Sequence, residues 1–251
     1  MSDRLEPLHR ARRVLCVQPH YDDNDLGAGG TLAALADAGA EIHYLTATDD
    51  LVGVLDPDLP DDEATRRLRA EQHEAGAILG IHEQHWLGLP DAGPYDYYTL
   101  RNGIVAAIRR LRPDVVFTVD PWLPFESHSD HLRVGRATAE ACMLHKHRRL
   151  RIDPEVDTAW DVDGPHDVTA LAMYFTTAPN ACFDVGATRE RKQRAIGAYR
   201  TQLTSEEVAF LGRGLEAIER RWAATEPFSH GEALKVLTPG LLHVNLLPEL
   251  L

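Results

Sequence analysis

Short apolar runs alternate with amphipathic stretches along the first half of this chain. Four runs have the length and composition of strands: RVLCVQ (13–18), EIHYLTAT (41–48), QHWLGL (84–89) and DVVFTVD (114–120). The stretches between and after them have the composition or apolar spacing of helices: 30–38, 61–79, 97–113 and 130–147. Glycine or proline ends three of these helices, at Gly39, Gly80 and Pro113. The alternation predicts an α/β fold, a Rossmann-like three-layer sandwich with a mostly parallel central sheet.

The second half of the chain continues the pattern less regularly. Strands are predicted near 168–175, 181–185, 233–237 and 241–246, and helices near 187–200 and 205–225. Residues 148–167 are polar and contain several Asp and Pro residues, which predicts a loop or an insertion. The sequence contains no internal repeat and no low-complexity linker. We therefore expect a single domain over residues 1–251.

Composition and charge narrow the function classes. The 251 residues are 44% hydrophobic and 26% charged, as in ordinary soluble globular proteins, and the formal charge of −13 argues against nucleic acid as a partner. The three cysteines, Cys16, Cys142 and Cys182, form neither a disulfide framework nor a metal-binding spacing, which suits a reducing compartment. The sequence shows no signal-peptide core and no apolar run of 18 residues, so we expect a cytoplasmic protein without a membrane partner.

Two polar segments follow predicted strands directly. The first is PHYDD at 19–23, after the strand at 13–18, and the second is DPWLPFESHSDH at 120–131, after the strand at 114–120. In an open α/β sheet, ligands collect at the carboxyl ends of the strands, where both segments are expected to lie. Taken alone, either segment would be read as a polar loop or a helix cap. Two such segments at two strand ends instead predict one shared site.

The residue types in these segments predict a catalytic metal centre. A catalytic zinc ion takes three protein ligands and keeps one open position, and His20, Asp23 and His131 would supply that set. A free carboxylate is then needed as general base, and Asp22 neighbours Asp23.

Two further residues complete a site for metal-assisted amide hydrolysis. His128 is placed to stabilise the oxyanion that forms when a carbonyl becomes tetrahedral. Asp130 could hold the His128 imidazole in the required tautomer.

A glycine-rich turn suggests a nucleotide-binding alternative, which the spacing excludes. Gly27 and Gly29 begin a dinucleotide fingerprint, but Leu32 occupies the position of its third glycine. The glycines also come nine residues after the strand ends, whereas the fingerprint requires them in the tight turn itself. We expect them instead to let the start of a helix approach the metal-binding loop.

The motifs resemble those of the PIG-L/LmbE family of zinc-dependent de-N-acetylases. PHYDDNDLGAGGTLA and SHSDHLRVG are similar to its H-P-D-D and H-P-D-H signatures, and RAEQHEAGAILGI (69–81), WLGLPD (86–91) and PNACFDVGATRERKQRAIGAYRTQ (179–202) extend the likeness. The phrase MYFTTAPN and the tail TPGLLHVNLLPEL are most similar to the diacetylchitobiose deacetylase type. The resemblance implies a Zn²⁺-dependent hydrolase that removes the acetyl group from an N-acetylglucosamine-type sugar or sugar conjugate.

The resemblance also implies substrate contacts and an assembly. Arg69 and Asp91 would contact the substrate, and the family branch suggests a homo-oligomer, a hexamer, in which His243 reaches the site of a neighbouring subunit. Tyr21 and Ser129 replace the two family prolines, which removes no ligand but reduces the restriction of both loops. Tyr21 is expected to narrow or reshape the substrate pocket.

Two rival functions stay open at this point. The first is a metal-dependent amidase or phosphoesterase acting on another small molecule. A phosphoesterase would need a basic clamp beside the metal, and only Arg133 is close in sequence. The second rival is a family member that binds a sugar without turnover, and the intact set of five candidate residues argues against it.

Overall fold

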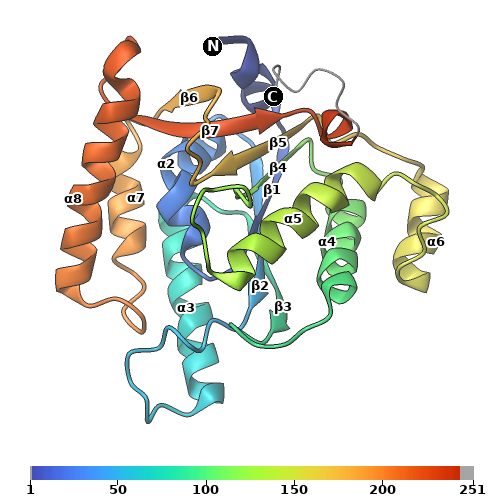
Figure 1. The fold of residues 1–251 in the computed structure, drawn as a ribbon, viewed down its shortest axis with the longest axis horizontal. Helices are drawn as coiled ribbons and strands as arrows, with labels where there is room; N and C mark the ends of the chain where they lie inside the picture. The colour runs from blue at the N-terminus through green and yellow to red at the C-terminus, as the bar shows by residue number, and fades with distance from the viewer. Residues whose placement is uncertain (1, 244–251) are drawn as a thin grey trace.

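The computed structural model describes residues 2–243, which are built around a seven-stranded sheet (Figure 1). The strands are β1 (Arg13–Gln18), β2 (Glu41–Thr48), β3 (Glu83–Leu89), β4 (Val115–Val119), β5 (Ala170–Tyr174), β6 (Ala181–Asp184) and β7 (Gly231–Leu237). Their order across the sheet is β3-β2-β1-β4-β5-β7-β6. Every pair among β1 to β5 is parallel, and β7 is antiparallel to both β5 and β6. The prediction of a mostly parallel sheet is confirmed.

Helices cover both faces of this sheet. They are α1 (Glu6–Arg10), α2 (Asp23–Asp37), α3 (Asp61–Leu79), α4 (Tyr97–Leu111), α5 (Ser129–Leu144), α6 (Pro154–Asp163), α7 (Arg189–Ile196) and α8 (Ser205–Trp222), with 3₁₀ turns η1 (Ser2–Leu5), η2 (Ala223–Thr225) and η3 (Pro239–Leu242). Figure 1 shows α2, α3, α7 and α8 to one side of the sheet and α4, α5 and α6 to the other. The predicted three-layer α/β architecture is therefore correct.

The alternation of side chains along β1 explains why both layers form. Cys16 is buried in the core beneath α2, together with Leu32 and Phe117. The preceding residue, Leu15, faces the opposite core, which contains Ile104 of α4. A strand that is apolar on both faces must be covered on both faces, because each face would otherwise expose apolar surface to water.

Three expectations about the elements are wrong. Helix α2 begins at Asp23 rather than near residue 30, so the glycines lie inside the helix and not at its start. A Cβ atom at Gly27 would lie 2.1 Å from Cδ2 of Tyr174, so this glycine lets α2 pack closely on β5. Residues 239–242 form a 3₁₀ turn where a strand was predicted at 241–246, and residues 244–246 lie outside the described residues.

The third error is at 148–167, where the predicted loop contains helix α6. The Asp153 side chain caps this helix by accepting from the main-chain N–H groups of Glu155 and Val156. Arg109 of α4 donates to Asp157 at 2.5 Å, and Trp160 is 2% exposed. Tertiary contacts thus stabilise a helix whose own sequence is polar. Within residues 2–243, none of the helices combines the length and apolarity needed to cross a bilayer.

The strand order brings the ends of β1 and β4 together at the centre of the sheet. From β1 the chain moves outward to β2 and β3, and then returns to place β4 and β5 on the other side of β1. In doubly wound sheets, ligands bind in the crevice where the order reverses in this way. The segments 19–23 and 120–131 follow the two strands that border this point.

Candidate metal centre

A network of hydrogen bonds fixes the loop between β1 and α2. The main-chain N–H of His20 donates to Oδ2 of Asp23 at 2.9 Å, so the carboxylate turns back over the loop that precedes α2. The Thr48 hydroxyl donates to the Pro19 carbonyl at 2.9 Å, and the Tyr21 N–H donates to Oδ2 of Asp50 at 2.8 Å. These contacts hold the loop in place although Tyr21 stands where the family signature has proline.

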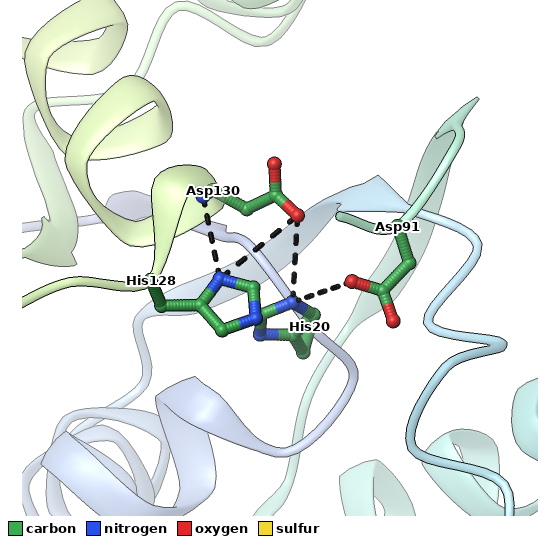
Figure 2. Close-up of side chains that lie close together, drawn as sticks. All are labelled: His20, Asp91, His128 and Asp130. Atoms are coloured by element: carbon green, nitrogen blue, oxygen red, sulfur yellow. Dashed lines mark hydrogen bonds and ion pairs between the residues drawn. The ribbon is translucent and has the colours of Figure 1, made fainter. Parts of the chain in front are cut away.

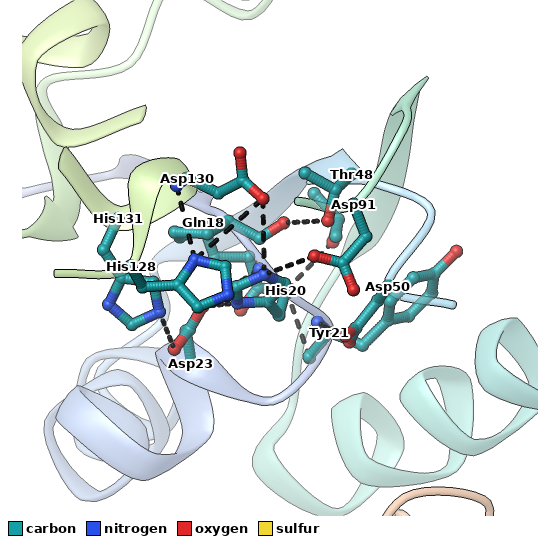
Figure 3. Close-up of polar contacts among 12 residues, drawn as sticks. Gln18, His20, Tyr21, Asp23, Thr48, Asp50, Asp91, His128, Asp130 and His131 are labelled. Carbon is teal, nitrogen blue, oxygen red and sulfur yellow. Dashed lines mark hydrogen bonds and ion pairs between the residues drawn. The ribbon is translucent and has the colours of Figure 1, made fainter. Parts of the chain in front are cut away.

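The first turn of α5 supplies the facing side chains. His128 is the N-cap residue of α5, and His131 lies in the first turn of the helix. The Nε2 atom of His131 is 3.4 Å from Oδ1 of Asp23, and Nδ1 of His20 is 3.3 Å from Oδ2 of the same carboxylate (Figure 3). The structure therefore brings together His20, Asp23 and His131 across more than a hundred residues of sequence.

The chemistry of this donor set fits a divalent metal ion. One ligand atom from each of His20, Asp23 and His131 lies within 4.8 Å of the others. Donors bound tetrahedrally to one zinc ion lie about 3.4 Å apart, and the two contacts to Asp23 measure 3.3 and 3.4 Å. The side chains are mostly buried, at 12%, 5% and 16% exposure. Two imidazoles and one carboxylate form a ligand set of catalytic zinc sites.

The other edge of the His20 imidazole faces two more carboxylates. Its Nε2 atom is 3.2 Å from Oδ1 of Asp91 and 3.9 Å from Oδ2 of Asp130 (Figure 2). Burial alone would lower the pKa of His20, but contacts with Asp130, Asp23 and Asp91 raise this pKa well above its ordinary value. The pocket therefore stabilises positive charge, which a divalent ion would also supply.

His128 is oriented by a different group from the one predicted. Its Nδ1 atom accepts the main-chain N–H of Asp130 at 3.3 Å, whereas the Asp130 carboxylate is 4.0 Å away. That carboxylate instead accepts from the Ala92 N–H at 2.8 Å and the Tyr95 hydroxyl at 2.7 Å. Because Nδ1 acts as an acceptor, a neutral His128 ring carries its proton on Nε2. The main-chain N–H of Asp130, rather than its carboxylate, therefore fixes the tautomer of the His128 ring.

Asp22 lies beside the donor set as the residue before α2. Its side chain makes no capping hydrogen bond to the helix. Burial and the neighbouring charge of Asp23 raise the pKa of Asp22 well above its ordinary value. A cation held by the adjacent ligands would oppose this shift, because opposite charge favours the ionised carboxylate.

Sequence reasoning missed two carboxylates that support the cluster. Oε2 of Glu126 is 3.3 Å from Nδ1 of His131, on the ring edge opposite the atom that faces Asp23. Oδ1 of Asp49 accepts the main-chain N–H of Asp91 at 3.0 Å. Glu126 is part of the 120–131 segment and could have been found there. Asp49 could not, because only the paired strands bring it to Asp91.

The two other predicted substrate contacts, Arg69 and His243, are not among the metal-ligating side chains. Arg69 is exposed on α3, with its guanidinium carbon 4.8 Å from the centre of the Trp86 ring. His243 is exposed after η3, and Leu237 pairs with Leu171 at the start of β5, which puts His243 at the opposite end of the sheet. Within one chain, His243 therefore does not reach the cluster, whereas the Arg69 guanidinium interacts with the side chain of Tyr21, the neighbour of His20.

Tyr21 does not narrow a substrate pocket, so that expectation is wrong. Its side chain is 1% exposed and belongs to a buried cluster with Leu68 of α3 and Tyr199. The site is instead bordered by Phe175, whose ring stacks on His131 with centroids 6.4 Å apart. Phe175 and Trp222 also line a cavity of about 290 Å³.

The chain is similar in sequence to a known protein family and to named deacetylases. Residues 15–142 match the model of the PIG-L family, described as GlcNAc-PI de-N-acetylase. A diacetylchitobiose deacetylase of Thermococcus kodakarensis is 30% identical over 243 residues, covering 95% of this chain and 88% of the relative. A 1D-myo-inositol 2-acetamido-2-deoxy-alpha-D-glucopyranoside deacetylase of Kineococcus radiotolerans is 33% identical over 172 residues, covering 56% of this chain and 47% of the relative.

Solved structures agree over nearly the whole chain. The N,N'-diacetylchitobiose deacetylase from Pyrococcus horikoshii, complexed with its inhibitor MPG, matches with a TM-score of 0.88 and 30% identity, covering 98% of this chain and 91% of that one. The conserved protein TT1542 from Thermus thermophilus matches with a TM-score of 0.73 and 28% identity, covering 90% and 94%. The range matched by the family model contains His20 and His131, and thus both segments of the cluster.

Proposed function

This chain belongs to the PIG-L family, and on that premise we propose that it is a metal-dependent hydrolase that removes the acetyl group from an N-acetylglucosamine-type sugar or sugar conjugate. The observation that carries the proposal is the convergence of His20, Asp23 and His131 at the switch point of the sheet. The named activities of the Thermococcus and Kineococcus relatives, both deacetylases, support this reaction class.

Zinc is the metal that this proposal assigns to the site. His20, Asp23 and His131 would hold it, since this ligand set suits zinc and the donor atoms are already close together. When bound, the ion would polarise the amide carbonyl and make water more acidic. The Asp91 carboxylate hydrogen-bonds the remaining ring nitrogen of His20, and the Glu126 carboxylate lies 3.3 Å from the remaining ring nitrogen of His131, so both rings are oriented for binding.

The remaining roles belong to Asp22 and His128. Asp22 takes a proton from the attacking water and delivers it to the amine that leaves. His128 presents Nε2–H to the developing oxyanion, because its Nδ1 atom is occupied by the Asp130 N–H. The ring is 41% exposed and can therefore meet a substrate. Asp130 acts as a positioning residue through its main chain.

The cavity beside the cluster suits the sugar part of the substrate. Its lining combines apolar side chains, among them Phe175 and Trp222, with the charged side chains of Lys192, Glu219, Arg221 and Glu232. Phe175 also stacks on His131. Arg69 stays a predicted substrate contact. His243 can act as one only across a subunit boundary, since it lies at the opposite end of its own sheet. A role for His243 at the site therefore requires a homo-oligomer, in which this residue reaches the site of a neighbouring subunit.

The phosphoesterase alternative is less well supported. Arg133 is the basic residue nearest to the ligands in sequence, but its guanidinium group donates to the carbonyls of Gly93 and Tyr95 and stacks 3.6 Å from the centre of the Tyr95 ring. The side chains around His20 are carboxylates, which repel a phosphate dianion.

Acetate release combined with metal analysis tests the proposal. The purified full-length chain is loaded with Zn²⁺ and assayed against N-acetylglucosamine, N,N'-diacetylchitobiose and a phosphomonoester panel. We expect metal-dependent release of acetate from at least one amino sugar, lost after chelation and restored by Zn²⁺. Release of phosphate without acetate would contradict the proposed deacetylation and support the phosphoesterase alternative.

A further inference from the structure

A second group of metal-ligating side chains lies at the other end of the sheet. His43 is on β2, and Glu83 and His85 are on the edge strand β3 (Figure 1). The strands are parallel, with His43 opposite Glu83 and Leu45 opposite His85. Because residues two apart on a strand share a face, Glu83 and His85 project on the same side of the strand pair. Their close contacts with His43 place all three side chains together.

Three of the four ring nitrogens of this group lack hydrogen-bond partners within the described part of the chain. His43 is 4% exposed, and neither of its ring nitrogens has a partner among residues 2–243. Nε2 of His85 is likewise buried without a partner in this part of the chain. Buried polar atoms in native proteins are almost always satisfied, so three such atoms in one place require an explanation.

The donor atoms are arranged around a common point. Oε2 of Glu83 is 3.6 Å from Nδ1 of His43 and 3.5 Å from Nε2 of His85. These distances exceed those of hydrogen bonds but are close to the separation of about 3.4 Å between two donors on one tetrahedral zinc ion. All three donor atoms lie within 4.8 Å of one another. Small side-chain adjustments would bring them to one ion.

We propose that His43, Glu83 and His85 bind a second divalent ion of the zinc class, separate from the candidate metal centre. Two imidazoles and one carboxylate select such an ion over magnesium or calcium, which prefer oxygen ligands. His43 lies five residues, roughly 16 Å, along β2 from Thr48, which contacts the candidate centre. The ion would join the edge strand β3 to β2 and leave a coordination position open to solvent.

Zinc stoichiometry measured on matched variants tests this site. The full-length chain is stripped with a chelator, dialysed against buffered free Zn²⁺, and analysed for zinc per chain. His85→Gln and Glu83→Gln change partly exposed side chains, at 33% and 57% exposure, so both variants should fold. His82→Gln is the matched control, because His82 is the exposed neighbour and lies outside the donor group.

We expect His85→Gln and Glu83→Gln each to bind one zinc ion fewer per chain than the wild type, and His82→Gln to bind the same number. The two variants should also lose part of the zinc-dependent rise in melting temperature, because a ligand that binds only the folded state stabilises it. Equal zinc contents in the wild type, His85→Gln and Glu83→Gln would overturn the proposal. Because the comparison counts a difference of one ion, it is independent of whether the candidate metal centre is occupied.

Discussion

The imidazole of His20 contacts the carboxylate of Asp91 through Nε2 at 3.2 Å, while its Nδ1 atom faces Asp23. A histidine that binds a metal through one ring nitrogen usually donates the other ring N–H to a carboxylate or carbonyl. Asp91 was predicted as a substrate contact, and that role stays a prediction. Its second oxygen accepts the Val52 N–H at 3.0 Å, so both oxygens of this buried carboxylate already have partners.

Replacing Asp91 by asparagine should weaken metal binding. The substitution keeps the shape of the side chain but removes the charge that favours the Nε2–H tautomer of His20. We expect the dissociation constant for Zn²⁺ to rise by about 10–100-fold, as for other supporting carboxylates of metal sites. Competition with a chromophoric chelator measures this dissociation constant. Asp58→Asn, on the exposed loop before α3, is the control. An unchanged affinity would show that Asp91 does not orient His20.

Replacing Asp22 by asparagine should stop the reaction without emptying the site. The amide cannot accept the proton of the attacking water, so kcat for acetate release should fall by about 10²–10⁴-fold. The zinc content should stay at the wild-type level, because the donors within 4.8 Å of one another belong to His20, Asp23 and His131. A variant with full activity would mean that another group is the base.

His128 can be tested by comparing two substitutions. His128→Ala removes the Nε2–H donor, and we expect kcat to fall by about 10²–10³-fold with little change in zinc content. His128→Gln retains an N–H donor on a side chain of similar length and should lose less. Equal losses in both variants would argue that the ring acts by packing and not by donating to the oxyanion.

The close packing of α2 on β5 should be sensitive to one methyl group. In Gly27→Ala the new Cβ atom would lie 2.1 Å from the buried Tyr174 ring, which cannot move freely because its hydroxyl donates to Asn24 at 2.9 Å. We expect the free energy of unfolding to fall by about 1–3 kcal/mol. Gly214→Ala in α8 meets no atom within 4 Å and should instead raise it by up to about 1 kcal/mol. Urea unfolding of both variants measures the difference.

The buried His145 should make stability depend on pH. Burial lowers its pKa below the ordinary value, although its ring nitrogens lie near the carbonyls of Cys142 and His166. As the pH falls through about 6.5, the unfolded chain takes up a proton that the folded chain resists, so stability decreases. The resulting slope is at most about 1.4 kcal/mol per pH unit for this one group.

The His145 effect is isolated by comparing the wild type with His145→Gln between about pH 7.5 and pH 5, a range that spans the ordinary pKa of histidine. Glutamine does not titrate, so the stability of the wild type relative to this variant should decrease as the pH falls. A constant difference over this range would show that the pKa of His145 is not lowered in the folded chain.

Local sequence predicted the elements that depend on local interactions. The strand at 13–18 and the helix at 61–79 have the predicted bounds, since their apolar periodicity and the left-handed Gly80 stop act within a few residues. Helix α2 begins earlier than expected because Asp23 accepts a hydrogen bond from the His20 N–H, and Gly27 lets the helix pack closely on Tyr174 of β5. Helix α6 was missed because its stability comes from Asp153, Asp157 and Trp160 contacting their surroundings.

The sequence by itself determined which side chains could form the centre, because histidines and carboxylates follow the strands at 13–18 and 114–120. Only the tertiary structure decided their partners: Asp91 on His20, Glu126 on His131, and the Asp130 main chain on His128. The tertiary structure also buried the Tyr21 side chain in the core and brought His43 next to Glu83 and His85. The physical reason is that hydrophobic periodicity is a local property of the chain, whereas the direction of a ring or carboxylate depends on atoms from strands far apart in sequence.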